Sequence, residues 1–415
     1  MVTDKTPTLN RTSVLPAAIA TLAQFIASSA GAQQVWSDPL IVSRAKEHAP
    51  LATAARGEAR RARARVEGAG LHPNPFVDWE RQQTFAPNAQ SQDVVRAHIP
   101  FDLSGRRAVA RLLAEVDAEG SSAEATQIGL RLAARALRFF YRALSLKRRI
   151  DLLQEAQAVL DEADRVLASR QATGEVSGYE RARLALEAEL ARSRLQSASA
   201  ERLVAAHELA ALLGAEGAAR TLEGDFDVAA PPAIDVLVAR ASRAHPLLRS
   251  LDTRLALARR ARGAAGTVWI PRFEIFGGYN NQAGPQVGRG YAVGVVLDLP
   301  VFDRGQGERA EADAALASVD QEARALRAAL RAAVGAAHDR LDAALKERQR
   351  FAGATVEDTE LLLRAVRTGY RGGERTLVEL LDARRAVLEV SERKLNLDLA
   401  VRLADVELRQ VTGAL

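Results

Sequence analysis

Long stretches of the chain carry the hydrophobic spacing of α-helices, and two of them are unusually long. Almost nothing interrupts the helical pattern from 106 to 172, which spans roughly 100 Å at about 1.5 Å per residue. A similar pattern runs from 306 to 368, and a shorter helical pattern follows each long one. Four apolar residues in the first stretch keep the heptad-type spacing of packed helices: Ile150, Leu153, Leu160 and Leu167. The pattern therefore predicts two long helical hairpins.

The second half of the chain repeats the plan of the first. Matching residues are separated by 196 to 200 positions, a near-constant offset that indicates an internal duplication. The matching pairs include Pro50 and Pro246, Pro75 and Pro271, Gly105 and Gly305, Gly174 and Gly373, and Ser177 and Thr376. We expect a first repeat at 33–222, a linker with a proline pair at 223–235, and a second repeat at 236–415. Each repeat would hold a helix, two strands, a long helix and a short helix.

The strand-like zones of the two repeats alternate apolar and polar residues with period 2, as in "RFEIFGGYNNQ" and "GYAVGVVLDLP". Each strand has about 10 residues, the length that crosses a bilayer when tilted. Ten of the 19 aromatic residues fall within 75–101 and 269–302, which is typical of aromatic girdles at a membrane surface. Four strands cannot close a barrel and open edges cannot face lipid, so several copies would have to close one together. The alternative is a small soluble sheet that caps the helices.

The two short helices each begin after a glycine-containing reversal, in "RQATGEVSGYERARLALE" and "YRGGERTLVELLDARRAVLE". A tight turn between antiparallel helices favours glycine at positive φ, which Gly174 and either Gly372 or Gly373 can supply. Ser177 and Thr376 can cap the following helices. A glutamate three residues after each cap, Glu180 and Glu379, completes a capping box.

The amino-acid composition excludes several classes of function. There is no cysteine, so disulfides and thiolate chemistry are excluded. The formal charge of +5 is dispersed among 52 acidic residues, and no basic face with interleaved aromatics is present, so we expect no nucleic-acid partner. Residues 1–32 combine basic residues, an apolar run and a small-residue site at Ala30 to Ala32, which predicts a secretory signal peptide.

Motifs of catalysis and cofactor binding are not found in the sequence. The six histidines, at positions 48, 72, 98, 207, 245 and 338, show no metal-ligand spacing. The chain has no phosphate-binding loop, nucleophile elbow or dinucleotide-binding loop. We therefore expect no catalytic residue, no cofactor and no metal site.

The sequence resembles the TolC-type outer-membrane efflux proteins over essentially all of its mature length. The resemblance is carried by the duplicated halves, the strand-to-helix junctions "IPFDLSGRR" and "LPVFDRGQG", and the reversal "GGERTLVELLDA". It implies a mainly α fold with a membrane β-barrel: a homotrimer in the lipid of the outer membrane, with four strands per chain in a 12-stranded barrel. A 12-helix tunnel would continue the barrel across the periplasm. The expected partners are a periplasmic adaptor and an inner-membrane pump of RND type.

The resemblance also implies roles for residues near the two reversals. By motif position, Tyr370, Arg375 and Glu180 would form the gate that closes the periplasmic end, with an Arg375 to Glu180 link. Glu379 and Asp382 would line the aperture as an acidic ring. Five residues would form the hairpin tips where an adaptor docks: Gly174, Ser177, Gly372, Gly373 and Thr376. The sequence departs from the family pattern at Tyr179, where a small hydroxyl residue is usual, and glutamate replaces the commoner aspartate at 180 and 379.

The function expected from this resemblance is a passive exit duct for small molecules or metal cations in a tripartite efflux system. Two alternatives remain at this stage. One is the same channel serving a type I protein secretion system. The other, which the helices alone would allow, is a soluble coiled-coil scaffold.

Overall fold

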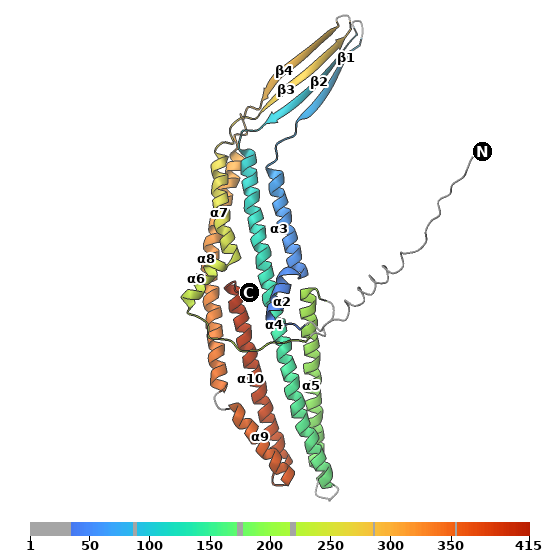
Figure 1. Cartoon of the computed structure of the whole chain (residues 1–415), viewed down its shortest axis with the longest axis vertical. Coiled ribbons are helices and arrows are strands. Elements are labelled where there is room, and N and C mark those ends of the chain that lie inside the picture. Colours follow the sequence, from blue (N-terminus) through green and yellow to red (C-terminus); the bar gives the residue numbers. More distant parts are fainter. Residues whose placement is uncertain (1–34, 86–88, 172–176, 216–220, 285–286, 353–354) are drawn as a thin grey trace, which may run out of the picture.

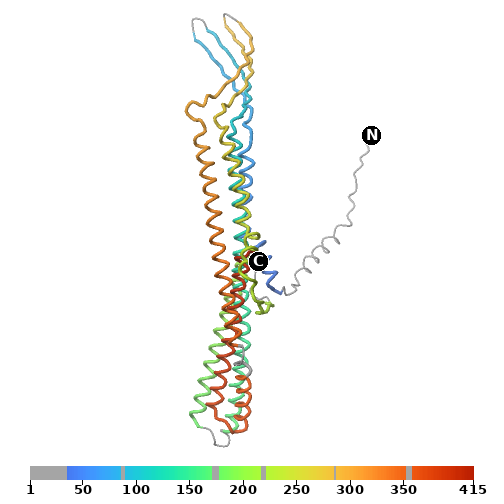
Figure 2. The backbone as a smooth tube through the Cα atoms, turned by 90° about the vertical axis from the view of Figure 1, so that its left-hand side faces the viewer, coloured from blue at the N-terminus to red at the C-terminus, as the bar shows by residue number. Residues whose placement is uncertain are grey.

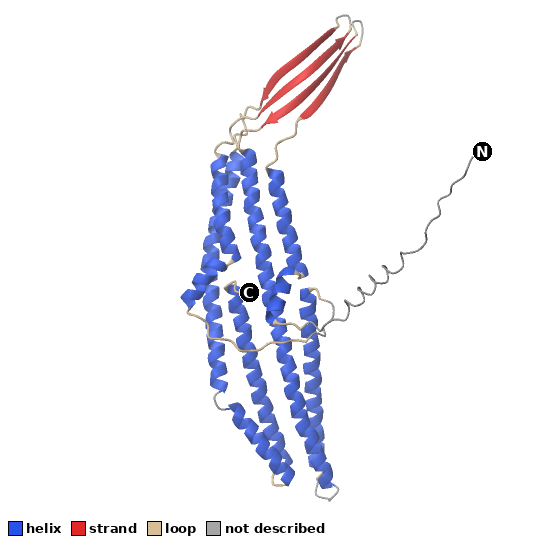
Figure 3. Cartoon of the chain, viewed as in Figure 1, coloured by secondary structure: helices blue, strands red, loops and turns tan. Residues whose placement is uncertain are grey.

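The computed structural model describes residues 35–85, 89–171, 177–215, 221–284, 287–352 and 355–415. The expected signal peptide at 1–32 and the turn residue Gly174 lie outside these ranges. The molecule is elongated, with a sheet at one end and long helices along the rest (Figures 1 and 3). Seen from the side, the helices run nearly parallel to the long axis and form a narrow shaft (Figure 2).

The described residues of the first half form four helices and two strands. Its helices are α2 (Asp38–Glu47), α3 (Pro50–Ala69), α4 (Arg106–Gln171) and α5 (Gly178–Leu213). The segment before the first strands, expected to be one helix, is divided between α2 and α3. The division falls at Pro50, because the residue before a proline avoids the helical conformation, and Ala49 has an extended ψ of 135°.

The second half forms five helices: α6 (Ile234–Ala244), α7 (Pro246–Ala265), α8 (Gln306–Ala352), α9 (Thr355–Gly372) and α10 (Leu377–Val411). Here one prediction is wrong. The pattern from 306 to 368 indicated one helix, whereas α8 and α9 are separate and their axes differ in direction (Figure 1). Residues 353–354, between the two helices, lie outside the described ranges.

The four strands form one antiparallel sheet in the order β1 (Phe76–Thr84), β2 (Gln90–Phe101), β3 (Phe273–Ala283) and β4 (Gly288–Leu297). The two predicted hairpins join through β2 and β3, which pair from Ser91 opposite Ala283 to Phe101 opposite Phe273. The two halves of the chain therefore share a single sheet, with β1 and β4 at its edges.

The sheet has an apolar face and a polar face. One cross-strand row of the apolar face aligns Trp79, Val95, Tyr279 and Tyr291, and further rows continue it toward the helices with valine, isoleucine and phenylalanine. These side chains are exposed in the single chain. The predicted alternation in β3 and β4 is confirmed, because Ile275 and Tyr279 share this face with Val293 and Val295.

The helices pack in a row beside one another. Near the sheet the row runs α3, α4, α7 and α8, and toward the opposite end α5, α4, α10 and α9 follow one another. No helix in the described ranges is long and apolar enough to cross a membrane.

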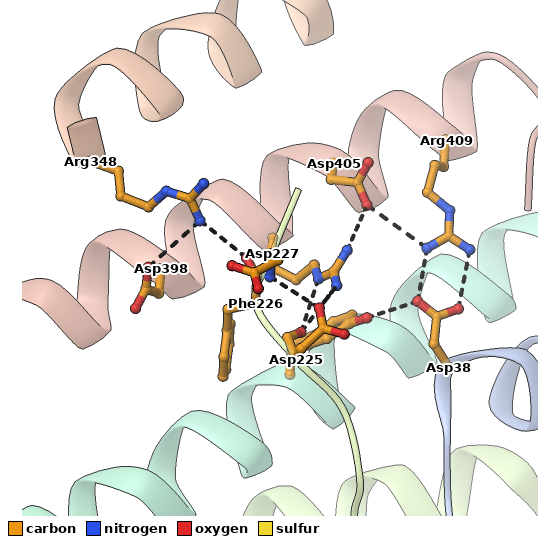
Figure 4. A network of polar contacts seen from close by, with 10 residues as sticks. Asp38, Asp225, Phe226, Asp227, Arg348, Asp398, Asp405 and Arg409 are labelled. Atoms are coloured by element: carbon orange, nitrogen blue, oxygen red, sulfur yellow. Dashed lines mark hydrogen bonds and ion pairs between the residues drawn. The ribbon is translucent and has the colours of Figure 1, made fainter. Parts of the chain in front are cut away.

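In the middle of the shaft, a polar network holds the segment that connects the two halves of the chain against the helices (Figure 4). Arg409 donates two hydrogen bonds to Asp38, at 2.8 and 3.1 Å, and the Tyr141 hydroxyl donates a third at 2.8 Å. Burial opposes ionisation of Asp38, but these hydrogen bonds outweigh it and lower the pKa of that carboxyl. Beside them, Arg402 donates to the main-chain and side-chain oxygens of Asp225.

Phe226 also holds the connecting segment in place. Its side chain is buried in the core beside Tyr141, and its carbonyl accepts a hydrogen bond of 3.2 Å from Arg348 of α8. The segment around residues 223–228 is therefore held by α4, α8 and α10 together, which ties both halves at one level of the shaft.

Replacing Arg409 by alanine should destabilise the protein. The change leaves the largely buried Asp38 without its bidentate partner, and removal of one member of such a pair costs about 3 kcal/mol. We expect a melting temperature several degrees lower, measured by circular dichroism of the purified protein. The matched control is Arg331→Ala, which removes a guanidinium 74% exposed and 3.9 Å from Asp235, and should cost less than about 0.5 kcal/mol. Equal small effects of both changes would show that the network does not stabilise the shaft.

Candidate functional site

The end of the shaft opposite the sheet holds the residues that the sequence singled out. Two helical hairpins end there side by side, α4 with α5 and α9 with α10 (Figure 1). The second reversal is described in full. Gly373 has a φ of 82°, and the amide of Glu374 donates to the carbonyl of Gly369 at 2.8 Å. Of the two candidate glycines, Gly373 therefore takes the left-handed conformation and Gly372 ends α9.

Both predicted capping boxes are confirmed. The Thr376 hydroxyl accepts from the Glu379 amide at 3.3 Å, and the Glu379 carboxylate accepts from the Thr376 amide at 2.8 Å. Ser177 and Glu180 make the same reciprocal pair, each at 3.3 Å. These caps satisfy amide groups at the first turns of α10 and α5, so each short helix begins at a defined residue.

The contacts that the predicted gate residues make within one chain differ from the expected link. Arg375 donates to Glu379 at 2.8 Å, on its own helix, and Glu180 caps α5. Tyr370 is buried, and its hydroxyl has no hydrogen-bond partner among the described residues. Burial raises the pKa of Tyr370, and the negative charge of Glu180 adds to this effect. Glu180 is therefore near Tyr370, and the Arg375 to Glu180 link stays a prediction.

The two predicted aperture acids stand one turn apart on α10. Asp382 is the more exposed of the two and lies 3.8 Å from Arg385. Hydrogen bonds from the amide of Thr376, from Arg375 and from the Thr376 side chain lower the pKa of Glu379 to about 2. Glu379 is therefore available as a negative charge near neutral pH. No group of three or more histidine or acidic side chains in the described residues is arranged to hold a metal ion.

Sequence reasoning missed the side chains that actually connect the two hairpins. Arg170 of α4 donates to the carbonyl of Tyr370 at 2.6 Å, and its guanidinium lies 5.1 Å from the centre of the Tyr370 ring. Glu162 of α4 accepts from both Arg367 and Arg371 of α9. These hydrogen bonds, led by the one from Arg371, lower the pKa of Glu162 to about 2.

A second connection joins the two short helices above the tip. Glu187 of α5 accepts from Arg384 of α10 at 3.2 Å and also from Arg385. The Glu187 and Arg384 side chains are only 5% and 3% exposed, so this pair is desolvated and strongly directional. The signal in the sequence was the repeat offset, because Glu187 and Arg384 are 197 positions apart and equivalent residues of the two repeats are separated by 196 to 200.

The connections cross a groove. A cavity of about 470 Å³ lies between α4, α9 and α10, and its lining includes Val159, Arg367 and Arg384. Helix α9 packs on α10 and is joined to α4 by the long side chains of Arg367 and Arg371. At the tip these ionic contacts lie beside an apolar cluster in which Leu160 and Leu167 of α4 pack with Leu377 and Leu380 of α10, so core packing and ion pairs together join the two hairpins.

Comparison with known proteins agrees with this architecture. Residues 237–414 match the family model described as outer membrane efflux protein. The chain is 25% identical over 335 residues to the cobalt-zinc-cadmium resistance protein CzcC of Cupriavidus metallidurans, covering 78% of this chain and 77% of that protein.

Solved structures share the fold. A membrane protein from Pseudomonas aeruginosa superposes with a TM-score of 0.72 and 18% identity, covering 91% of this chain and 93% of its own. The outer membrane protein VceC from Vibrio cholerae superposes with a TM-score of 0.69 and 16% identity, covering 91% and 96%.

A shaft of paired helical hairpins ending in a sheet with one apolar face is, with these matches, the architecture of an outer-membrane channel protein. The chain resembles the outer membrane efflux proteins, whose family model matches its second half. It is therefore a component of an efflux channel, located in the outer membrane and extending into the periplasm, and is not an enzyme. Proteins of this family work with adaptors and inner-membrane pumps. These matches support the efflux channel over the coiled-coil scaffold that the helices alone allowed.

The Glu162 connection should show a defined pH dependence. Its folded-state pKa of about 2 lies below the ordinary value of 4.5, so its stabilising contribution is complete above about pH 5 and is lost as pH falls toward about 2. The difference in melting temperature between wild type and Glu162→Gln should therefore be largest near neutral pH and shrink in acid. Glu189→Gln is the control, since Glu189 is exposed and pairs with Arg192 on its own helix. A wild-type to Glu162→Gln difference that is the same at all pH values would contradict this assignment.

Proposed function

We propose that three copies of this chain form the outer-membrane exit duct of a tripartite efflux system. The proposal rests on the edges of the sheet and of the helical row. Each has two unpaired edges, and each unpaired edge strand is connected to a helix at the end of the row. The edge strand β1 follows the end helix α3, and the edge strand β4 leads into the end helix α8. Unpaired strand edges are not tolerated in lipid, and pairing β4 of one copy with β1 of the next satisfies both edges.

Four strands per chain then make a 12-stranded barrel from three chains. The row α3, α4, α7 and α8 from each chain makes a 12-helix tunnel, with α8 of one copy beside α3 of the next. The division into repeats supports this arrangement: 33–222 and 236–415 hold equivalent elements, joined by the linker 223–235. Residues 1–32 serve as the signal peptide that directs the chain to the periplasm.

The proposed cargo is divalent metal cations. The relative CzcC is a cobalt-zinc-cadmium resistance protein, and Glu379 and Asp382 supply carboxylates at the aperture. Three chains would present six such carboxylates, and a ring of this kind attracts cations and repels anions. The duct itself is passive, since energy comes from the pump in the inner membrane.

The partners follow from the placement of the tips. A periplasmic adaptor docks at the hairpin ends formed by Gly174, Ser177, Gly372, Gly373 and Thr376, and an inner-membrane pump of RND type lies beyond it. In the closed state Tyr370, Arg375 and Glu180 hold the tips of the three chains together. The buried Tyr370 hydroxyl without a partner and the nearby Glu180 charge support this role, because a neighbouring chain can supply the missing contact.

The assembly predicts the native mass of the protein. Extraction of isolated outer membranes with detergent should yield a complex of three chains, measured by light scattering or native mass spectrometry. Isolation with a metal-exporting inner-membrane pump would support the cargo, whereas isolation with a protein-secretion pump would identify the type I alternative. A monomer or dimer would contradict the shared barrel.

The gate predicts a change in conductance. Arg375→Ala removes a link between chains at the closed tip and should raise single-channel conductance in planar bilayers severalfold. Glu180→Gln should have the same effect, because it removes the other member of the link. Arg192→Ala is the matched control, since Arg192 is an exposed arginine of α5 paired within its own helix, and should leave conductance unchanged. Unaltered conductance in both tip variants would remove the gate assignment while leaving the channel intact.

A further inference from the structure

The polar face of the sheet carries one group of charged side chains, at the end nearest the helices. We call it the junction cluster, and its members come from three strands: Asp78 and Glu80 of β1, Arg96 and His98 of β2, and Glu274 of β3. The antiparallel register brings them onto the same face as neighbours. Every other strand residue on this face is uncharged, including all those that β4 contributes.

His98 is the centre of the cluster. Its side chain is only 12% exposed, and its ring is stacked between two phenylalanines, 4.5 Å from Phe76 and 5.6 Å from Phe276 between ring centres. Each ring nitrogen faces a carboxylate, Nδ1 that of Glu274 and Nε2 that of Asp78. Since an ionised carboxylate only accepts hydrogen bonds, both nitrogens carry a proton in this arrangement. The geometry is that of a positively charged imidazolium.

Arg96 neutralises part of the remaining charge. It lies 3.2 Å from Asp78 and 3.1 Å from Glu80. With His98 protonated, the cluster holds three carboxylates and two cations and has a net charge of −1. Loss of the His98 proton makes it −2 and leaves one carboxylate without its donor.

Two glycines leave room for the side chains of the junction cluster. A Cβ at Gly294 would lie 2.5 Å from the Phe276 ring, and a Cβ at Gly278 would lie 2.9 Å from Cγ of Arg96. Side chains at either position would displace the ring that stacks on His98 or the guanidinium that pairs with Asp78. The cluster is therefore accommodated by small residues on both neighbouring strands, β3 and β4.

The position of the cluster in the channel follows from the two faces of the sheet. The opposite face is the apolar one, with exposed residues such as Trp79 and Val293, and it faces lipid in the trimeric channel proposed above, on which this inference rests. The polar face then lines the lumen. Three clusters would form a ring where the barrel meets the helical tunnel, with a net charge of −3 that becomes −6 when the three histidines lose their protons.

We propose that the junction cluster is a charge-selectivity ring in the barrel and that proton binding by His98 sets its strength. Within a narrow, partly desolvated pore, rings of acidic side chains enrich cations and exclude anions. Protonated His98 weakens this preference, and its deprotonation strengthens it. Cation transfer into the barrel therefore becomes more selective as pH rises through the histidine range.

The test compares ion selectivity at two pH values for the full-length trimer in planar bilayers. With a potassium chloride gradient, the potassium-to-chloride permeability ratio of the wild type should rise roughly twofold between about pH 5 and about pH 9, the upper limit being set high because two carboxylates stabilise the charged ring. In His98→Asn the side chain is neutral throughout, so the ratio should remain at its high value at both pH values. Glu379 of the aperture does not interfere, because its pKa of about 2 lies well below the tested range.

Matched variants separate His98 from other histidines. His72→Asn changes an exposed histidine that precedes β1 near the same end of the sheet, and His338→Asn changes one on α8; both should keep the wild-type pH response. Glu80→Gln removes a carboxylate that contacts Arg96 but not His98, so it should lower the ratio at both pH values while the response to pH remains. Glu80→Gln also tests the ring independently if His98→Asn does not assemble.

Three results would overturn the proposal: a pH response that survives in His98→Asn, a response that disappears in His72→Asn, or selectivity unchanged by Glu80→Gln. The outcome also distinguishes failure of the selectivity ring from failure of the proposed trimeric duct. Failure of the wild type to form channels refutes the trimeric duct and the ring together. If channels form but their ion selectivity does not depend on the junction cluster, only the selectivity ring is refuted.

Discussion

Burial of the apolar positions of α4 along its whole length is the interaction on which the shaft depends. Every hydrophobic cluster in the described core contains residues of this helix, from Val109 near the sheet to Leu167 near the tip. A single rod of 66 residues cannot cover its own apolar seam, so shorter helices must pack along it end to end. Near the sheet α3 and α7 do so, and near the tip α5 and α10 replace them. The shaft therefore has two sets of helices packed on α4, one near the sheet and one near the tip.

The internal repeat decides which charges meet across this shaft. Residues separated by about 200 positions lie at the same depth, because each repeat runs through the same sequence of elements. Arg106 therefore reaches Asp303 at the sheet end, Glu187 reaches Arg384 above the tip, and Arg170 reaches Tyr370 at the tip. The two halves are connected at successive levels by pairs whose separation in the chain is close to the repeat offset.

These connections differ in strength from level to level. In the middle, Asp38 and Arg409 form a bidentate pair beside the buried Phe226, so the two halves cannot separate there without breaking the core. At the tip, Glu162 is reached by half-exposed arginines across a groove. Half-exposed ion pairs are weak compared with core packing. At the tip, too, the two hairpins are joined mainly by core packing, in the apolar cluster that contains Leu167, Leu184 and Tyr370, and the exposed ion pairs add to it.

The sequence by itself determined the types of the elements, the turns and the faces of the strands. Helical and strand periodicities are local properties, so the long hairpins, the period-2 alternation of Ile275 and Val293, and the capping boxes at Ser177 and Thr376 could be predicted from neighbouring residues. The separation of α8 from α9 was not predicted, because the helical periodicity of the sequence runs through both segments.

Only the tertiary structure decided which side chains became partners. Arg375 bonds to Glu379 on its own helix, and Glu162 rather than Glu180 receives the arginines of α9. His98 had no ligand spacing in the sequence, because its carboxylate neighbours come from strands 20 positions before it and 176 positions after it. A contact of this kind is set by strand register and by the rotation of helices about their axes. Both are fixed by burial of the apolar residues as a whole, and no short stretch of sequence encodes them.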